Sequence, residues 1–172
     1  ELFDGGRVSK TRLALTDRID AKTYFLIGEK PVPSCQSYRS EKGYCEGLLG
    51  SMSDPNMKFI QVYNEQGDII ARAALRLLSD ESEDPQLFLE RVYSTNQHPK
   101  IAEAMVAFAQ KKARDMGIGL YGSSDTPGAD SRRSLTLSSH GSRAPYVYTD
   151  AGGGLRPNGA FEIKAVAIDV ST

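Results

Sequence analysis

Three side chains that lie far apart in the sequence have the types that a thiol-dependent enzyme uses. Cys35 would supply a nucleophile, His140 a base, and Asp150 an acid that orients the base. Cys35 follows a proline-rich turn and His140 lies in a segment expected to be a loop, where catalytic groups tend to be placed. No family-specific signature surrounds Cys35, and a small buried thiol with a solvent-facing histidine fits the same residues. A cysteine-dependent hydrolase or transferase is therefore one hypothesis.

The cysteines and histidines lack the spacing of a metal site. Cys35, Cys45, His98 and His140 show none of the close pairing found in zinc sites, so we expect no metal. Without a visible secretory signal, we expect both cysteines to be reduced thiols of a cytoplasmic protein rather than a disulfide. The sequence does not begin with Met, from which we expect a piece of a longer protein whose targeting signals would lie elsewhere.

The composition is that of an ordinary globular domain. The chain has 172 residues, 40% hydrophobic and 25% charged, with a formal net charge of −1. This composition argues against disorder, and the near-neutral charge gives no general attraction to nucleic acid or an anionic membrane. No run approaches the roughly 20 apolar residues of a membrane-spanning helix. We expect one domain over residues 1–172, with no membrane or nucleic-acid partner, and the oligomeric state stays open.

Arginines occupy expected strands, where charged residues are usually depleted. Arg72 and Arg76 would point to the same face of their strand, and Arg12 and Arg91 lie on others. With Arg91 on a neighbouring strand, the pair would form an anion-binding surface or a protein-docking face. A non-catalytic binding module of a larger protein is therefore another hypothesis, although solvated sheet edges explain the arginines equally well.

The first half of the chain is expected to form strands around one short helix. Alternating apolar residues predict a strand over 8–15, and an apolar run ended by Gly28 predicts another over 23–27. The segment 35–50 is expected to hold a short helix. Two β-rich runs, 58–63 and 68–78, surround a short glycine-containing loop and predict a hairpin.

The second half is expected to contain the longest helix. Residues 87–93 predict a strand, and an apolar stripe with Pro99 at its first position predicts a helix over 100–116. A strand over 118–121 follows, and strand–helix–strand order implies a parallel pair. After a polar loop over 125–133, we expect a short strand over 135–138 and a last strand over 161–168. The predicted fold is α/β (α+β), with a mixed, largely antiparallel sheet, one long crossover helix and one or two short helices.

This order of elements resembles the GCN5-related N-acetyltransferase fold. In that family a hairpin precedes a long strand, which passes through a phosphate-binding loop into a helix, followed by another strand. A later segment, 144–153, is similar to the family's pattern of an Ala and a Tyr before a Gly. The resemblance covers about two-thirds of the chain and implies an acetyl-CoA-dependent N-acyltransferase acting on an amine of a small molecule or protein.

The resemblance also implies where the cofactor would bind. The family's loop is rich in glycine because its backbone N–H groups close around a pyrophosphate at the helix N-terminus. The corresponding run here has no glycine, and Pro99 removes one donor. The residues implied in cofactor binding are Ser94, Thr95, Asn96, Gln97, His98, Lys100 and Ile101.

Two further side chains take catalytic roles by resemblance. Glu90, on the strand before the loop, resembles the carboxylate that some family members use as the base. Tyr148 looks like the tyrosine that often protonates the leaving thiolate. An ion pair between Glu90 and Arg91 on the sheet surface and a packing role for Tyr148 are the structural alternatives.

Overall fold

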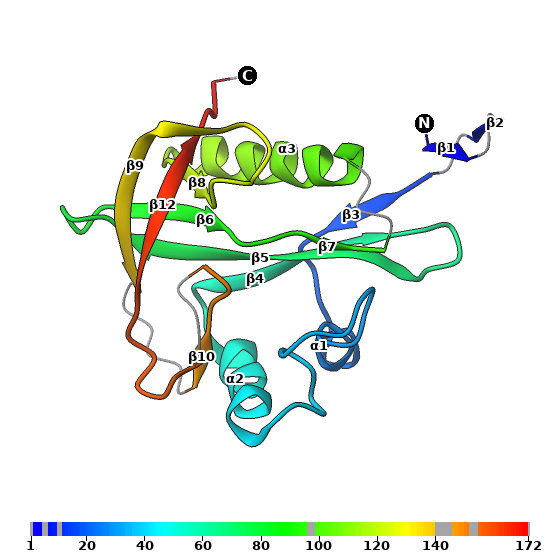
Figure 1. The fold of residues 1–172 in the computed structure, drawn as a ribbon, viewed down its shortest axis with the longest axis horizontal. Helices are drawn as coiled ribbons and strands as arrows, with labels where there is room; N and C mark the ends of the chain where they lie inside the picture. The colour runs from blue at the N-terminus through cyan, green and yellow to red at the C-terminus, as the bar shows by residue number, and fades with distance from the viewer. Residues whose placement is uncertain are drawn as a thin grey trace.

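The computed structural model describes residues 2–4, 7–9, 12–95, 99–139, 146–151 and 155–171. Most of its strands belong to one eight-stranded sheet with the order β3-β4-β5-β6-β8-β12-β9, in which β7 pairs with β5 (Figure 1). The strands of this sheet are β3 (Ala14–Thr16), β4 (Met57–Tyr63), β5 (Ile69–Ser79), β6 (Pro85–Leu89), β7 (Tyr93–Ser94), β8 (Leu120–Gly122), β9 (Ala129–Ser139) and β12 (Glu162–Ile168).

Two small antiparallel pairs complete the β-structure. One pair is β1 (Leu2–Asp4) with β2 (Arg7–Ser9), and the other is β10 (Val147–Tyr148) with β11 (Leu155–Arg156). In the main sheet, β6 and β8 are parallel, and the other described pairings are antiparallel. The mixed, largely antiparallel sheet and the parallel pair across a helix confirm the predicted fold class.

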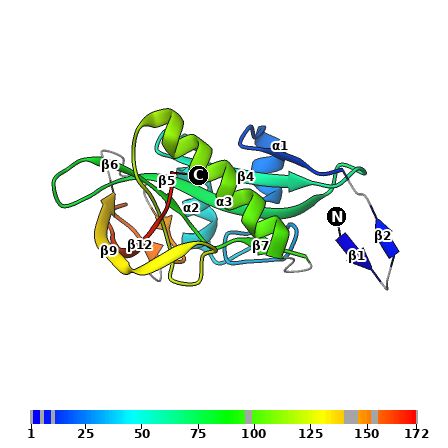
Figure 2. The same ribbon diagram turned by 90° about the horizontal axis from the view of Figure 1, so that it is seen from above.

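The helices cover opposite faces of the sheet. The long helix α3 (Pro99–Met116) lies on one face, and α1 (Ala21–Leu26) and α2 (Lys42–Ser53) lie on the other (Figures 1 and 2). The stripe that predicted α3 is buried: Ile101, Met105 and Ala109 pack on the side chains of β5, β6 and β8. On the opposite face, Tyr24 and Leu48 pack against Phe59 and its neighbours. Each face of the sheet therefore has its own apolar core.

The strand β9, at one end of the sheet order, also pairs with β5 in the middle of the sheet. It pairs with β12 over most of its length, and Leu78 and Ser79 of β5 also pair with its last residues. Strands β5, β6, β8, β12 and β9 thus form a closed ring of pairings. A third apolar core, with Phe88, Leu137 and Ile163 among its residues, fills the space beside this ring.

The strand expected over 23–27 is wrong, because residues 23–26 belong to α1 and Ile27 is its C-cap. The backbone N–H of Thr23 donates to Asp20 Oδ1 at 2.7 Å, which caps the helix N-terminus. Tyr24 and Ile27, three residues apart, are both buried on the face that packs against α2 and β4. The Asp20 cap and the burial of Tyr24 and Ile27 on one helix face therefore outweigh the strand propensity of this short apolar run.

Other boundaries also differ from the expectations. The single strand expected over 8–15 is two separate strands, β2 and β3, and the polar loop expected over 125–133 is wrong from Ala129 onward, where β9 begins. Residues 131–134 of β9 are exposed, so the strand lacks the apolar alternation that would have revealed it. The short helix expected within 35–50 is α2, which continues to Ser53. None of the described helices has the length and apolar character needed to cross a membrane.

Candidate functional site

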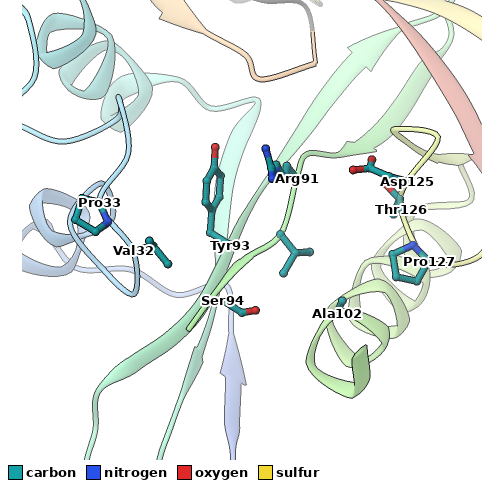
Figure 3. A pocket seen from close by; sticks show the side chains of 10 residues that line it. Val32, Pro33, Arg91, Tyr93, Ser94, Ala102, Asp125, Thr126 and Pro127 are labelled. Atoms are coloured by element: carbon teal, nitrogen blue, oxygen red, sulfur yellow. The ribbon is translucent and has the colours of Figure 1, made fainter. Parts of the chain in front are cut away.

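A cavity opens where the two parallel strands separate. Strands β6 and β8 pair only from Leu87–Leu120 to Leu89–Gly122. Beyond that point the segment that continues β6 pairs with β5 as β7. Residues 123–128, which follow β8, turn away toward β9. The space between them is a cavity of about 430 Å³ (Figure 3). It is lined by Val32, Pro33, Arg91, Val92, Tyr93, Ser94, Ala102, Asp125, Thr126 and Pro127.

The walls of this cavity carry opposite charges and a free strand edge. Arg91 and Asp125 come from opposite walls, and the Asp125 carboxylate is directed toward the Arg91 side (Figure 3). Tyr93 lies on the same side of the cavity as Arg91. Because β7 pairs with β5 on one side only, the backbone at Tyr93 and Ser94 has no strand partner on its other edge among the described residues. An extended ligand with amide groups would find donors and acceptors there.

The residues predicted to bind a cofactor are placed in different ways. Ser94 lines the cavity. The backbone N–H of Thr95 donates to the Ile70 carbonyl oxygen at 3.1 Å, which extends the pairing of β7 with β5. Lys100 is exposed in the first turn of α3, whereas the Ile101 side chain is 4% exposed and packs in the core. Asn96, Gln97 and His98 lie outside the described residues.

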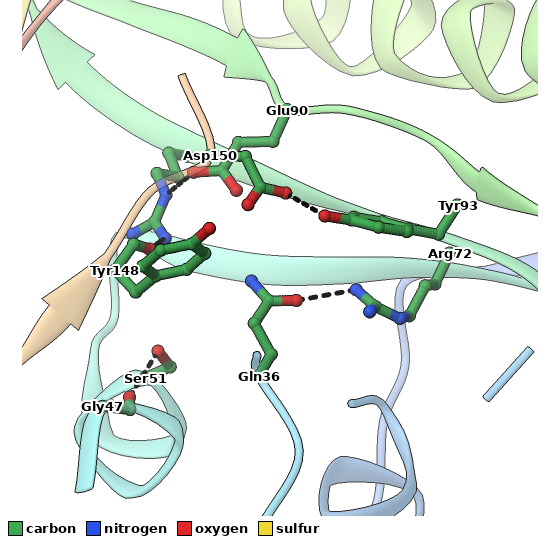
Figure 4. Close-up of polar contacts among 9 residues, drawn as sticks. Gln36, Gly47, Ser51, Arg72, Glu90, Tyr93, Tyr148 and Asp150 are labelled. Atoms are coloured by element: carbon green, nitrogen blue, oxygen red, sulfur yellow. Dashed lines mark hydrogen bonds and ion pairs between the residues drawn. The ribbon is translucent and has the colours of Figure 1, made fainter. Parts of the chain in front are cut away.

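On the sheet face opposite α3, buried polar side chains form a second feature of the site (Figure 4). Arg72 of β5 is 1% exposed, and its guanidinium donates to the Lys30 carbonyl oxygen, Gln36 Oε1 and Ser34 Oγ at 2.7–3.0 Å. It also lies over the Tyr93 ring, 4.3 Å from the ring centroid. Burial lowers the pKa of Arg72, and the negative groups around it oppose this effect. The arginine therefore fixes the segment between α1 and α2 against the sheet.

A buried ion pair lies next to Arg72 on the same strand face. Arg76 Nε donates to Glu90 Oε1 at 2.5 Å, and each side chain is 2% exposed. The Arg76 guanidinium also donates to the backbone oxygen of Tyr148, which attaches β10 to the sheet. Arg72 and Arg76 share one face, as predicted, but they are buried and engaged and form no exposed docking surface. The predicted partner of Glu90 was Arg91, whereas the structure pairs it with Arg76.

The side chains of two tyrosines and a cysteine lie around Asp150. The Tyr93 hydroxyl donates to Asp150 Oδ2 at 2.6 Å. The Tyr148 hydroxyl lies near Asp150 and Cys35, and its ring contacts that of Tyr44 edge to face at 5.3 Å between centroids. Burial raises the pKa of both Tyr93 and Tyr148, and Asp150 raises them further, so both hydroxyls stay protonated at neutral pH. The cluster Cys35–Tyr93–Tyr148–Asp150 thus holds a carboxylate beside two hydroxyl donors.

The structure brings together some of the predicted catalytic residues. Cys35 and Asp150 both lie near the Tyr148 hydroxyl. Arg76 donates both to the Glu90 carboxylate and to the Tyr148 backbone oxygen. His140 lies outside the described residues. Both cysteines are free thiols, and no group of three metal-ligating side chains occurs in the described part of the chain. Sequence reasoning missed Tyr93, which both lines the cavity and donates to Asp150; its position at the end of the strand before α3 was the available signal.

A second cavity, of about 460 Å³, lies near the start of α1 and has charged walls that are already paired. Asp17 on its wall is 2.5 Å from Lys112 Nζ and 4.0 Å from Lys58 Nζ. It shares no lining residue with the first cavity or with the cluster around Asp150.

Comparisons with known proteins find solved structures of low sequence identity and no family. No protein-family model and no curated protein matches the sequence. Among solved structures, a transcriptional regulator from Bacillus halodurans C-125 is 14% identical with a TM-score of 0.48, over 71% of this chain and 85% of that one.

A GCN5-related glucosamine N-acetyltransferase region of a fungal multi-domain GH3 β-N-acetylglucosaminidase is 15% identical with a TM-score of 0.43. The match covers 72% of this chain and 15% of that one. Likeness at this level says nothing about activity.

Proposed function

We propose that this domain binds an acyl-CoA in the cavity between β7 and residues 125–127 and transfers the acyl group to an amine. The observation that carries the proposal is the separation of β6 from β8, which leaves a cavity of about 430 Å³ directly before α3. An extended thioester arm would lie along the free edge of β7, where its amides can bond to the backbone. The acetyltransferase resemblance supports the same location.

The phosphate end of the ligand would lie toward the start of α3. A helix N-terminus offers backbone donors and a positive dipole to an anion, although Pro99 removes one donor and the preceding loop has no glycine. Arg91, exposed on the cavity wall, supplies a positive charge in compensation. Binding in this proposal depends more on side chains than on a glycine-rich loop.

The catalytic chemistry would take place at the inner end of the cavity, where Tyr93 connects it with Asp150. Tyr148 remains protonated at neutral pH and would donate its proton to the departing thiolate. Glu90 is 2% exposed and bound to Arg76, so in this proposal it positions β10 through that arginine.

Thermal unfolding with acetyl-CoA tests the proposal, with ADP as the control for the shared nucleotide. A ligand at about 100 times its dissociation constant stabilises the native state by ~2.7 kcal/mol. We expect acetyl-CoA at millimolar concentration to raise the Tm clearly more than ADP does. No rise with acetyl-CoA would remove the acyltransferase function from consideration and leave a binding module.

A matched pair of variants places the ligand. Ala102→Phe would fill the cavity from α3, whereas Ala104→Phe adds the same ring to an exposed position of the same helix. We expect Ala102→Phe to lose the acetyl-CoA-dependent rise in Tm and Ala104→Phe to keep it. Equal rises in both variants would place the ligand elsewhere.

A cysteine-dependent transferase or hydrolase is the second candidate, favoured by the contact of Cys35 with Tyr148 and its position near Arg72. Cys45, on α2, is partly exposed like Cys35 and is the internal control. Alkylation of Cys35 at least tenfold faster than Cys45, with loss of activity, would support this candidate; equal rates would exclude it.

A further inference from the structure

We propose that the second cavity, beside the start of α1, binds a small aromatic carboxylate. The cavity of about 460 Å³ lies where three segments meet: residues 17–24, the end of α2 and the start of β4. Its volume falls within the range of small-molecule sites. Because it shares no lining residue with the cavity proposed for acyl-CoA, this inference is independent of the acyl transfer.

Positive charge exceeds negative charge on and beside this cavity. Arg18 and Lys58 line it together with two carboxylates, and Lys112 lies 2.5 Å from one of these, Asp17. Both carboxylates are engaged, since Asp17 pairs with Lys112 and Asp20 caps α1. Lys58 is 62% exposed and 4.0 Å from Asp17, which leaves donors of its ammonium for another anion. Three cations beside two carboxylates favour a ligand with one negative charge.

A buried hydroxyl on the wall also lacks an acceptor. Tyr24 is 6% exposed, and its hydroxyl makes no hydrogen bond of normal geometry among the described residues, although Ser51 lies close to it. Burial raises the pKa of Tyr24, so the hydroxyl stays a donor at neutral pH. An unpaired buried hydroxyl costs free energy, and an ionised acceptor forms the stronger hydrogen bond. A carboxylate in the cavity would supply that acceptor.

The apolar side chains of the cavity suit an aromatic ring. Met52 comes from the end of α2 and Met57 from the start of β4, and the Tyr24 ring forms part of the same wall. A methionine sulfur makes favourable contacts with aromatic rings, and its flexible side chain adapts to their shape. Met52 is 38% exposed, so a bound ring would also remove apolar surface from water. An inorganic anion would leave these groups uncovered.

The four methionines of the chain allow the site to be tested by NMR. Met52 and Met57 line the cavity, Met105 is fully buried beneath α3, and Met116 lines an adjoining hollow of about 170 Å³. In protein labelled with ¹³C at the methionine methyl groups, we expect 3-phenylpropionate to shift the Met52 and Met57 signals saturably. The Met105 signal should not move. A shift of Met116 without Met52 would place the ligand in the adjoining hollow and overturn the proposed site.

Ligands of similar size and different charge test the chemical class. At pH 7.5, 3-phenylpropionamide is neutral and 3-phenylpropylamine is a cation. Because hydrogen bonds to a charged group are the stronger ones, we expect both to bind at least ~tenfold more weakly than 3-phenylpropionate. Inorganic phosphate, which has the charge but no ring, should cause no saturable shift at the same concentration. Equal affinities for the acid and the amide would reject an anion site, and saturable binding of phosphate would reject the aromatic requirement.

Variants of the wall separate binding from folding. Tyr24→Phe removes only the unpaired hydroxyl, and Lys58→Gln removes an exposed charge. Each should weaken 3-phenylpropionate binding by at least ~threefold, with an unchanged Met105 signal as evidence of an intact core. Ala21→Phe would fill the cavity and abolish the shifts, whereas Ala104→Phe adds the same ring to an exposed position of α3 and should keep them. Wild-type affinity in Tyr24→Phe and Lys58→Gln, or in Ala21→Phe, would overturn the proposal.

Discussion

At the level of single residues, the Arg76–Glu90 pair is the contact most sensitive to substitution. Both side chains are 2% exposed, so each charge depends on the other. Glu90→Gln leaves the Arg76 guanidinium buried without its counter-charge, and loss of one partner of a buried pair costs about 3–5 kcal/mol. We expect urea unfolding to show a loss of this size.

A double variant separates the contribution of the two charges to stability from the contribution of the side-chain volume. Arg76→Met combined with Glu90→Leu removes both charges and keeps most of the apolar volume. We expect it to be more stable than Glu90→Gln, because no unpaired charge is left. A Glu90→Gln variant with wild-type stability but no acyl transfer would return Glu90 to the role of catalytic base.

Asp17 links the end of β3 to α3 and should make stability depend on pH. Partial burial on its own raises the pKa of Asp17, but the hydrogen bond and charge of Lys112 outweigh it and hold the pKa below the ordinary value of 3.8. A lowered pKa in the folded state stabilises the protein above the unfolded-state pKa, and this contribution is lost as the pH falls through the folded-state pKa.

Comparison with Asp17→Asn measures this contribution. At pH 7 we expect the variant to be less stable by about 0.5–1 kcal/mol in urea unfolding, because the pair is partly exposed. The difference should shrink as the pH is lowered below 3.8. A difference that stays constant down to pH 2 would show that the ion pair does not cause it.

At the level of elements, the packing of α2 on the segment before β10 positions the Asp150 cluster. A Cβ atom added to Gly47 of α2 would clash with the Tyr146 backbone oxygen. Alanine normally favours a helix over glycine by roughly 0.5–1 kcal/mol. We nevertheless expect Gly47→Ala to lower the Tm, because backbone must move, and to reduce acyl transfer. Gly67→Ala cannot serve as the control substitution, because Gly67 has a positive φ that alanine would adopt only with strain.

Elements with strong periodicity could be predicted from the sequence. The hairpin β4–β5 and the helix α3 have long apolar patterns, and their buried residues pack in the cores on the two faces of the sheet. The helix α1 could not be recognised in this way, because it has only six residues and depends on the Asp20 cap. The strand expected over 135–138 lies within β9, but the first half of β9 was missed because it carries Ser131, Arg132 and Arg133 in place of apolar residues.

The candidate site was predicted in part. Residue types and resemblance had pointed to four of its residues, Glu90, Tyr148, Cys35 and Asp150. In the structure, Arg76 contacts Glu90 and Tyr148, and the Tyr148 hydroxyl lies near Cys35 and Asp150. Their grouping depends on the pairing of β10 with the rest of the fold through Arg76, a contact between residues 72 positions apart. No local pattern encodes such a contact.

For the whole molecule, the central position of β5 should govern local stability. It pairs with four strands, β4, β6, β7 and β9, whereas β10 pairs only with β11 among the residues that the structure describes. Amides in β5 therefore open only when most of the sheet opens. We expect hydrogen exchange to be slowest in β5 and much faster in β10. Equal protection of the two strands would show that the fold opens as one unit.

The position of β12 determines the order in which the sheet can be completed during synthesis. It is made after β8 and β9, yet it lies between them and supplies hydrogen bonds to both. Until residues 162–168 leave the ribosome, both earlier strands have an open edge that can pair with another nascent chain. Strands β3 to β6 can pair as they emerge. The ring of β5, β6, β8, β12 and β9 closes only when β12 has been made.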